Sequence, residues 1–357
     1  MITLDELRKG INAIDDELLI LLNQRMEFVK QVGHLKQTDG SSIYRPERER
    51  EIIQRLASQS EGELTENAIE ALFMEIFAIS RNLELPEKIA YLGPEGSYTH
   101  QAAESRFGAM SAYLPLNSIE AVFKVLENKE AKDGVVPIEN NTDGVVGTTL
   151  DCLGKYSPLI IAELYLDIHH SFATHSEDLK DIKIIYSHPQ GYNQCKNFLE
   201  EHFLLDVEFI PTRSTAAAAR RAKEDENAAA ICSHIAAKIH GLPIHFEKIE
   251  DNLANRTRFL ILSDFKNEKG VLDKTSILAQ TEDKPGALLE FLQSFEDKKI
   301  NLLKIESRPI KDKAFKPLFY IDFQGHIDDD NIQEIFKLYP NKIKWLGSYI
   351  SGEKDEI

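Results

Sequence analysis

The sequence predicts a multidomain protein with an all-helical N-terminal module, a two-lobed α/β domain and a C-terminal βαββαβ domain of ferredoxin-like arrangement. Its 357 residues are enough for two or three domains of ordinary size. Apolar residues recur at helical spacing in the first part of the chain, whereas strand and helix patterns alternate after Pro86. The last part has two strand–helix–strand patterns in succession. We expect domains at residues 1–86, 87–264 and 274–351.

The charge balance and the cysteines narrow the class of protein. The chain has 42 Lys and Arg against 59 Asp and Glu, a formal net charge of −17, which argues against a nucleic-acid binder because such proteins present a basic face. Cys152, Cys195 and Cys232 lie far apart and show no metal-ligand spacing. No uncharged apolar run could span a bilayer, and the N-terminus lacks the apolar core of a signal peptide. We expect a soluble cytoplasmic protein with no membrane partner and no metal.

Three helices are predicted for the N-terminal module. The first begins at a capping-box pattern from Thr3 to Glu6. Its apolar residues step by three and four, at Leu4, Leu7, Ile11, Ile14, Leu18, Leu21, Phe28, Val32 and Leu35. A second helix starts near Pro46, and a third follows Thr65. A first helix reaching Gln37 would be about 50 Å long, too long for a lone bundle to cover, so we expect a dimer with intertwined first helices.

Each predicted helix also carries ionisable or polar groups on its apolar face, which we expect to be buried. These are Arg25 and Lys36 on the first helix, Glu49 with Arg48 beside it on the second, and Ser80 and Glu84 on the third. One interpretation is a buried structural ion-pair network. The other is a pocket for a small dianion, which we favour because an unneeded buried charge is costly and easily replaced by an apolar residue. In a dimer, Arg8 at the edge of the first helix would reach into the pocket of the other subunit.

These residues resemble the pattern of the all-helical chorismate mutases over the whole module. The resemblance assigns chorismate binding to Arg8, Arg25, Lys36, Arg45, Arg48, Glu49, Ser80 and Glu84. It implies a pericyclic rearrangement of chorismate to prephenate with no cofactor and no covalent intermediate. The arginines would hold two carboxylates in a compact conformer. Lys36 would donate to the ether oxygen as negative charge builds there.

Two positions depart from the mutase pattern. Position 84 is Glu where some members carry Gln as a second donor to the ether oxygen, and a carboxylate donates only when it is protonated. We therefore count Glu84 with Lys36 as catalytic and expect mutase activity to rise toward acid pH. Arg45 stands where some members have Asp. The family's contact there involves a backbone amide, so we expect the change to be tolerated.

The central module is predicted to be α/β because strand and helix patterns alternate along it. Strands are expected at 89–92, 134–138, 159–168 and 182–186, and helices at 98–107 and 118–126. A Ser-capped helix, a charged loop and a strand occur twice in this order, from Ser118 and from Ser214. This internal repeat suggests two lobes with a cleft between them. Small-residue turns after the strands, such as Gly93–Thr99, suit a ligand that carries a carboxylate.

Four ordered motifs of this module resemble those of the prephenate dehydratases. They are Tyr91–Ala103, Pro137–Asp151, Ser187–Cys195 and Asn255–Phe259. The resemblance implies a fold similar to type II periplasmic binding proteins, and the loss of CO₂ and a ring hydroxyl from prephenate to give phenylpyruvate. It assigns catalysis to Thr257, Arg258 and Phe259, and prephenate binding to Glu139, Asn140, Thr142, Ser187 and Gln194.

The implied chemistry gives these residues different roles. The ring hydroxyl needs a proton donor because hydroxide is a poor leaving group. Thr257 is expected to donate through a hydrogen-bond network or to position the substrate, and Arg258 to hold the pyruvyl carboxylate through two hydrogen bonds. The family's usual Glu-Asn-Ser has Asn at its third position here, Asn141, with Thr142 as the adjacent hydroxyl.

The C-terminal module follows a charged, turn-rich segment at 265–273. Strands are expected at 275–280, 301–307, 318–323 and 343–349, and helices at 287–295 and 331–338. Two motifs, Lys284–Leu288 and Ile305–Pro309, closely resemble the ligand motifs of ACT regulatory domains. The resemblance implies phenylalanine as an allosteric effector bound between paired ACT domains. Its contacts would be Gly286, Ala287, Leu288, Glu306, Ser307, Arg308 and Pro309.

Together the three resemblances point to the bifunctional chorismate mutase–prephenate dehydratases that end in an ACT domain. They imply a homodimer or homotetramer that acts on chorismate and prephenate without a cofactor. Two alternatives stay open on the sequence. One keeps the fold but takes arogenate, and the other is a non-catalytic amino-acid sensor. The intact Thr257–Phe259 run and the full set of mutase cations argue against the sensor.

Overall fold

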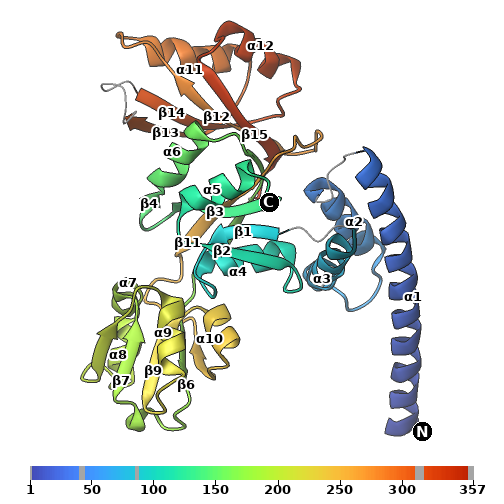
Figure 1. The fold of residues 1–357 in the computed structure, drawn as a ribbon, viewed down its shortest axis with the longest axis vertical. Coiled ribbons are helices and arrows are strands. Elements are labelled where there is room, and N and C mark those ends of the chain that lie inside the picture. The colour runs from blue at the N-terminus through green and yellow to red at the C-terminus, as the bar shows by residue number, and fades with distance from the viewer. Residues whose placement is uncertain (1, 40–44, 85–87, 310–316, 353–357) are drawn as a thin grey trace. The chain divides into compact units, whose positions relative to one another are not determined.

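The computed structural model describes residues 2–39, 45–84, 88–309 and 317–352. The chain forms two compact units. The first contains residues 1–87 with 107–112, and the second contains residues 88–106 with 113–357. The first unit is helical. The second contains three β-sheets and the helices that cover them (Figure 1).

The helical unit has the three helices that the sequence predicts, α1 (Leu4–Asp39), α2 (Pro46–Gln59) and α3 (Glu66–Glu84). Thr3 and Glu6 form the predicted capping box, since the Thr3 amide donates to the Glu6 carboxylate at 2.8 Å. The core is small and consists of Val29, Ile53, Ile69, Met74, Phe77 and Ala78. Gly33 lets α1 approach α3 closely, because a Cβ there would lie 2.9 Å from Glu84 Cα.

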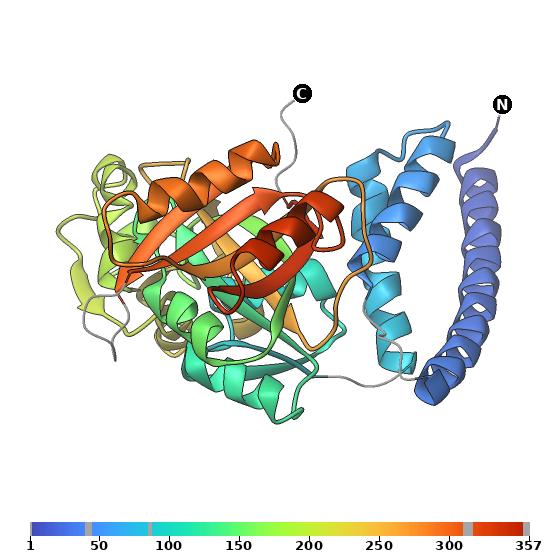
Figure 2. The same cartoon turned by 90° about the horizontal axis from the view of Figure 1, so that it is seen from above.

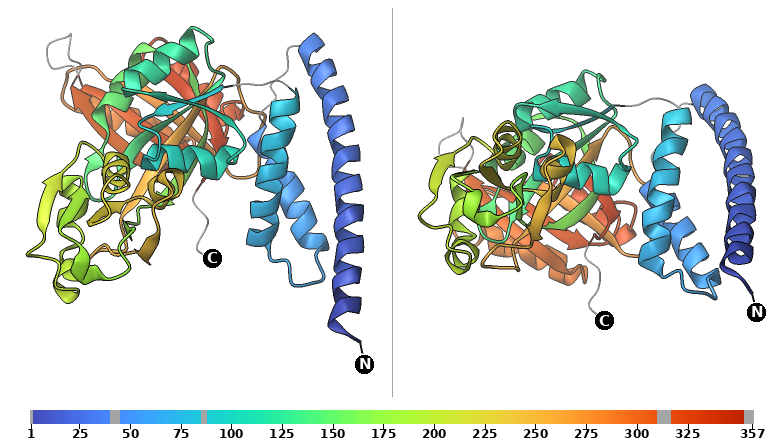
Figure 3. Two further views of the ribbon diagram at one scale, coloured as in Figure 1. Left: turned by 60° about the horizontal axis from the view of Figure 1, so that its bottom comes forward. Right: turned by 90° about the horizontal axis from the view of Figure 1, so that it is seen from below.

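The N-terminal part of α1 extends beyond α2 and α3 (Figure 3). Its apolar residues are more than half exposed in this chain, at Leu4, Leu7, Ile11, Ile14, Leu18 and Leu21. A row of large apolar side chains along one helix is usually covered by another surface. The single chain therefore leaves a long apolar face uncovered.

The first lobe of the second unit is built on a mixed sheet with the order β2-β1-β3-β11-β5, and β4 pairs with β3. Its strands are β1 (Lys88–Leu92), β2 (Ala112–Leu116), β3 (Asp133–Asn140), β4 (Gly144–Val145), β5 (Leu159–Asp167) and β11 (Arg256–Ser263). Its helices are α4 (Tyr98–Phe107), α5 (Ile119–Glu127) and α6 (Gly147–Lys155). β1 and β3 are parallel, whereas β11 runs antiparallel to both of its neighbours.

The second lobe has a sheet with the order β10-β6-β9-β7-β8. Its strands are β6 (Ser171–Thr174), β7 (Ile184–Ser187), β8 (Glu208–Pro211), β9 (Ala228–Cys232) and β10 (Ile244–Glu247). Its helices are α7 (Pro189–Asn193), α8 (Lys196–Glu201), α9 (Thr215–Ala222) and α10 (His234–His240), with a short 3-10 helix at Leu179–Asp181. The chain enters this lobe after β5 and returns to the first lobe at β11, so two crossing segments join the lobes (Figure 1).

The internal repeat in the sequence corresponds to the two lobes of this domain. Ser118 and Ser214 are both helix N-caps, and each side chain accepts the amide of the residue three positions on, at 3.1 Å. The helices α5 and α9 that they open lead through charged loops to β3 and β9, one in each lobe. The short strands β2, β4, β6, β8 and β10 were not predicted.

The C-terminal domain has the predicted βαββαβ order in one antiparallel sheet, β13-β14-β12-β15. Its elements are β12 (Asp273–Gln280), α11 (Ala287–Asp297), β13 (Leu302–Pro309), β14 (Pro317–Gln324), α12 (Asp330–Leu338) and β15 (Ile343–Ile350). Both helices pack on one face of this sheet, as the view from above shows (Figure 2). The other face lies on the first lobe.

The C-terminal sheet and the first lobe share one hydrophobic core. Leu278, Tyr320 and Leu346 pack in the same cluster as Leu260 and Leu262 of β11. Gly347 lies in β15 with φ of 149°, and a Cβ at this position would overlap the carbonyl oxygen of Ile160 in β5. A side chain at 347 would therefore hold the two sheets apart.

Candidate active sites

The helical unit brings together four of the predicted chorismate-binding residues in two polar contacts. Arg25 Nη1 donates to Ser80 Oγ at 2.6 Å, and the Arg25 guanidinium lies 5.9 Å from the centre of the Phe77 ring. Lys36 Nζ donates to Glu84 Oε2 at 2.9 Å, with both side chains largely buried. Burial lowers the pKa of Arg25 from its ordinary value, and the charge of Glu84 opposes this. Two cations thus lie on the face of α1 that meets α3.

Glu49 is buried on α2, and it pairs with Arg81 of α3. Arg81 also donates from Nη2 to the Phe107 carbonyl oxygen at 2.7 Å. Sequence reasoning missed Arg81, although it directly follows Ser80 on the same helix. The contact shows that part of the polar set in this module holds the helices together.

The other three predicted arginines lie outside this group. Arg8 lies near the N-terminus of α1, 4.0 Å from Asp5, and its side chain is 67% exposed. Arg48 is equally exposed and pairs with Glu51 at 3.0 Å. Arg45 is the residue before α2, and its carbonyl oxygen accepts the Glu49 amide. Within one chain, the structure does not bring Arg8 or Arg48 to Arg25 and Lys36.

The second unit has a cavity of about 450 Å³ between its two lobes. Residues from the first lobe, the second lobe and both crossing segments line it. Four of them were predicted from the sequence, namely Asn140, Gln194, Thr257 and Phe259. The cavity lies at the ends of β1, β3 and β7, where ligands collect in open α/β sheets.

Asn140 and Thr257 form the centre of this cleft. Asn140 Nδ2 donates to Thr257 Oγ1 at 2.7 Å and to Asn255 Oδ1 at 2.9 Å. Asn140 Oδ1 accepts the amides of Thr142 and Asp143, which fixes the orientation of the carboxamide. Because Thr257 Oγ1 accepts from Asn140, its own proton can be donated to a ligand.

A second polar group faces the cleft, with His170 from a crossing segment, Tyr98 from α4 of the first lobe and Gln194 from the second lobe. His170 Nε2 lies 2.9 Å from Gln194 Oε1, and His170 Nδ1 lies 2.7 Å from the Tyr98 hydroxyl. Burial lowers the pKa of His170, although the bond to Gln194 acts in the opposite direction. A neutral ring accepts from Tyr98 and donates to Gln194. Sequence reasoning had singled out neither His170 nor Tyr98 as a site residue.

Glu250 connects the two crossing segments, one between β5 and β6 and the other between β10 and β11, through its carboxylate. Its Oε1 lies 2.6 Å from His169 Nδ1, and its Oε2 accepts the His170 amide at 2.8 Å. The Ile168 amide donates to the Asn255 carbonyl oxygen at 2.8 Å, which joins the same two segments nearer the cleft. Gln190 Nε2 of the second lobe donates to Asp143 Oδ2 of the first at 2.8 Å. The cleft is therefore bordered by contacts that would change if the lobes moved.

Arg258 does not reach the cleft, which corrects the expectation that it holds the substrate carboxylate. It alternates with Thr257 and Phe259 along β11, so its side chain leaves the opposite face of the sheet. Its guanidinium donates to Glu163 Oε2, to Asp322 Oδ2 and to the Tyr349 hydroxyl, at 2.7, 2.7 and 3.1 Å. These partners occupy the guanidinium on the side of the C-terminal sheet.

Three further predicted residues also do not line the cavity. Glu139 forms an ion pair with Lys304 of β13. Ser187 is buried and donates to carbonyl oxygens of His188 and Ile231. Thr142 is exposed, and its backbone amide donates a hydrogen bond to Asn140 Oδ1.

A cation that sequence reasoning missed lies in the cleft instead. Arg213 lines the cavity with Ser214 and Thr215, at the N-terminus of α9. The amide groups at this helix start add positive potential to that of the guanidinium. The sequence offered a signal, because Ser214 had been identified as the start of a helix, and Arg213 immediately precedes it.

The two predicted effector motifs lie at the same end of the C-terminal sheet. Gln280 of β12 is opposite Leu318 of β14, which is opposite Arg308 of β13. Gly286 follows β12 and caps α11 with φ of 84°. The motifs are thus two strand spacings apart, about 10 Å. β13, which ends at Pro309, is an edge strand of this sheet.

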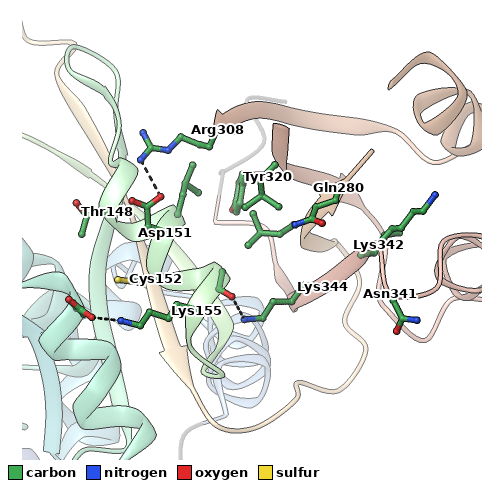
Figure 4. Close-up of a pocket in the computed structure, with 16 residues that line it drawn as sticks. Thr148, Asp151, Cys152, Lys155, Gln280, Arg308, Tyr320, Asn341, Lys342 and Lys344 are labelled. Carbon is green, nitrogen blue, oxygen red and sulfur yellow. Dashed lines mark hydrogen bonds and ion pairs between the residues drawn. The ribbon is translucent and has the colours of Figure 1, made fainter. Parts of the chain in front are cut away.

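Arg308 of the second motif contacts the first lobe. Its Nη2 lies 3.3 Å from Asp151 Oδ1 of α6, and the guanidinium covers Gly147 at the start of that helix (Figure 4). Lys344 of β15 donates to the carbonyl oxygens of Leu153 and Tyr156 near the other end of α6, at 2.8 and 2.6 Å. A cavity of about 610 Å³ lies between α6 and the C-terminal sheet. The effector motif therefore contacts the dehydratase-like lobe directly.

In the part of the chain that the structure describes, no helix is long and apolar enough to cross a membrane. Within the same residues, no group of three or more His, Cys, Asp or Glu side chains could hold a metal ion.

Three family models match the chain in succession. The chorismate mutase type II model matches residues 7–85, the prephenate dehydratase model residues 89–267 and the ACT domain model residues 275–337. They cover the helical module, the two-lobed domain and most of the C-terminal domain.

Whole-chain relatives combine these modules in the same way. The bifunctional chorismate mutase/prephenate dehydratase of Aquifex aeolicus is 38% identical over 353 residues, which cover 97% of each chain. That of Escherichia coli is 31% identical and covers 97% of this chain and 95% of its own. Among solved structures, the prephenate dehydratase of Arthrobacter aurescens in complex with L-Phe is 32% identical, with a TM-score of 0.67 over 74% of this chain and 90% of that chain.

Proposed function

The chain belongs to the family of bifunctional chorismate mutase/prephenate dehydratases, and on this premise we propose how its own residues carry out the two reactions. The helical module converts chorismate to prephenate, and the two-lobed domain converts prephenate to phenylpyruvate. The observation that carries the second assignment is the Asn140–Thr257 pair, which lines a cleft between two lobes. The relatives named above fit this pair of activities, and neither arogenate nor a non-catalytic sensor is needed to explain the residues.

In the mutase pocket, cations orient the substrate and stabilise its transition state. Arg25, held by Ser80, binds a carboxylate of chorismate in the compact conformer that the rearrangement needs. Lys36 donates to the ether oxygen, where negative charge builds as the carbon–oxygen bond breaks. Glu84, 2.9 Å from Lys36, is the second donor when it is protonated.

The pocket is completed by a second copy of the chain. The exposed apolar row of α1 needs a cover, and an antiparallel α1 from another subunit presents the same apolar row to it. Such a dimer brings the exposed Arg8 of one subunit toward the pocket of the other, beyond the reach of Arg8 within a single chain. The dimer is thus part of the proposed active site.

In the dehydratase cleft, Thr257 is the proton donor. The bond from the ring to the departing carboxylate breaks, and its electron pair forms a ring double bond as the hydroxyl leaves. Thr257 gives its proton to that hydroxyl and takes one back from solvent, so the products are phenylpyruvate, CO₂ and water. Asn140 donates to Thr257 Oγ1 and so stabilises the negative charge that builds there.

Arg213 and the N-terminus of α9 hold the pyruvyl carboxylate in this proposal. Phe259, together with Val145 and Ile168, gives the cavity an apolar surface against which the ring can lie. His170 stays neutral and holds Gln194 in place. Arg258 acts from behind the sheet and does not touch the substrate.

The C-terminal domain binds phenylalanine and inhibits the dehydratase. The backbone at Gly286 and the start of α11 suit the carboxylate of an amino acid, and the second motif on β13 contacts the first lobe through Arg308. A second subunit pairing at the β13 edge would complete the site, as a homodimer or homotetramer. We also place the enzyme in the cytoplasm, since its three cysteines are free, buried thiols.

A coupled assay tests the proposal. Wild-type enzyme supplied with chorismate should release phenylpyruvate, and phenylalanine should slow this release. The Thr257→Ala variant should accumulate prephenate, because its dehydratase kcat should fall about 10³-fold while its mutase rate is unchanged. Dehydratase turnover at the wild-type rate in Thr257→Ala would remove Thr257 from the mechanism.

A further inference from the structure

The strands that carry the proposed catalytic pair present two rows of side chains to opposite faces of their sheet. Asn140 lies opposite Thr257, and Glu139 lies opposite Arg258. Because side chains alternate along a strand, the first row faces the cleft and the second row leaves the back of the sheet. Each member of the back row is covalently next to a member of the catalytic pair.

One cross-strand row of the C-terminal sheet covers this back row. Lys304 of β13 lies opposite Asp322 of β14, and Asp322 lies opposite Ser276 of β12. Lys304 forms an ion pair with Glu139, and Asp322 accepts from Arg258 at 2.7 Å. The row therefore contacts both strands of the catalytic pair at once.

The contact to Arg258 is a buried group of four charges. Glu163 binds Arg258 with one carboxylate oxygen, at 2.6 Å, and Lys274 of β12 with the other, at 2.7 Å. With Asp322 the group is neutral, and the side chains of all four residues are at most 4% exposed. Burial opposes the charge of Arg258, but the neighbouring groups, including Asp322, raise its pKa above the ordinary value. A buried group of charges like this adds little stability over apolar packing. We therefore explain its presence by the position in which it holds β11.

The contact to Glu139 differs from that group because it is partly open to water. The side chains of Lys304 and Glu139 are 19% and 33% exposed. Lys304 also lies on the same strand as the effector motif, two residues before Glu306. A shift of β13 on binding an amino acid would therefore change the Lys304–Glu139 contact, whereas the buried group could remain in place.

We propose that Lys304 and Arg258 are positioning residues of the dehydratase site, which hold the Asn140–Thr257 pair from behind. Arg258 fixes β11 to the C-terminal sheet. Lys304 fixes the end of β3 through Glu139 and transmits the state of the effector site to the catalytic pair. This inference rests on the proposed role of Thr257, and it names residues through which phenylalanine acts.

The experiment compares Lys304→Met and Glu139→Gln with their double variant. Each single variant should lower dehydratase kcat about tenfold with little change in the KM for prephenate, and each should weaken phenylalanine inhibition by a similar factor. The double variant should be no slower than either single variant, because both remove the same contact. Mutase turnover in the same chain should stay at the wild-type rate.

Lys298→Met is the matched control. Lys298 is a lysine of the same domain that pairs with Glu334, an ion pair between α11 and α12 away from β3. This variant should keep wild-type kcat and inhibition. Wild-type kcat and inhibition in Lys304→Met and Glu139→Gln would overturn the inference, as would effects that add in the double variant. If Thr257→Ala loses turnover in the same series, the proposed function stands even when the inference falls.

Discussion

The two proposed active sites of this chain use opposite electrostatic designs. In the helical module the central groups are ions, with Arg25 and Lys36 facing α3 and Glu84 beside Lys36. In the cleft, the central groups are the neutral side chains of Asn140 and Thr257, and the ions next to them in sequence, Glu139 and Arg258, are on the back of the sheet.

The difference follows from the two reactions. The rearrangement moves negative charge onto an oxygen within a dianion, so fixed cations at that position lower the barrier. The elimination needs a proton delivered to a leaving hydroxyl. A cation beside the departing carboxylate would stabilise the ground state and slow the loss of CO₂. In the proposed site, neutral donors near the ring and a cation at the pyruvyl end would meet this requirement.

The largest effect that tests this comparison is expected in the mutase pocket. Lys36→Met keeps the length of the side chain and removes the charge. Mutase kcat should fall about 10³-fold, because the ether oxygen loses its donor. Added prephenate should still be converted at the wild-type rate. Lys30→Met, an exposed lysine on the same helix, is the control. Equal mutase rates in the two variants would contradict the ionic design of this pocket.

The next effect tests the neutral design of the cleft. In Asn140→Asp one oxygen can still accept the turn amides of Thr142 and Asp143, but the other becomes an acceptor for the Thr257 proton. We expect dehydratase kcat to fall about 100-fold with little loss of folding stability. Steady-state kinetics and the melting temperature measure the two quantities. A variant with wild-type kcat would show that Thr257 does not need Asn140 as a donor.

A smaller effect is expected for the cation in the cleft. Arg213→Gln should raise the KM for prephenate about thirtyfold and change kcat less, since a hydrogen bond to a charged group contributes roughly 2 kcal/mol. Arg220→Gln on the same helix is the control, because Arg220 is exposed and does not line the cavity. If both variants bind prephenate as wild type does, another group holds the carboxylate.

The smallest effect concerns Glu84. A carboxylate there donates only when protonated, so wild-type mutase activity should rise as the pH falls. Glu84→Gln has an amide donor at every pH, so its profile should be flatter and its rate at pH 8 about fivefold higher. Mutase pH–rate profiles measure this directly. Identical profiles for the two proteins would exclude Glu84 as a donor.

The sequence was sufficient for the elements whose signals are local. The apolar spacing of α1, the capping box at Thr3 and the helix at Tyr98–Phe107 all follow from neighbouring residues. Short strands such as β2 and β10 carry no such signal, because they are specified by the strands that pair with them. The fold class was therefore predictable, and these short strands were not.

The candidate dehydratase site also depends on contacts that local sequence signals do not reveal. The motif at 255–259 includes Thr257, which lines the cleft, but it was not recognised as part of a strand, whose alternation places Thr257 and Arg258 on opposite faces. The partners of Arg258 lie far away in sequence, at Glu163 and Asp322, and no local pattern connects them. Arg213 could have been found by treating the turn before Ser214 as a ligand-binding turn.

The core shared by the first lobe and the C-terminal sheet has a practical consequence for making a phenylalanine-resistant enzyme. Deleting the regulatory domain would remove Leu278 and Tyr320 from the shared core. It would also leave the buried Arg258 without Asp322 and the buried Glu163 without Lys274. Even the connecting segment is anchored, since the buried Asn267 side chain donates to Ile161 and Ser348 carbonyl oxygens at 2.7 and 2.9 Å. We therefore expect truncation to destabilise the first lobe, whereas a single change on β13 leaves the shared core in place.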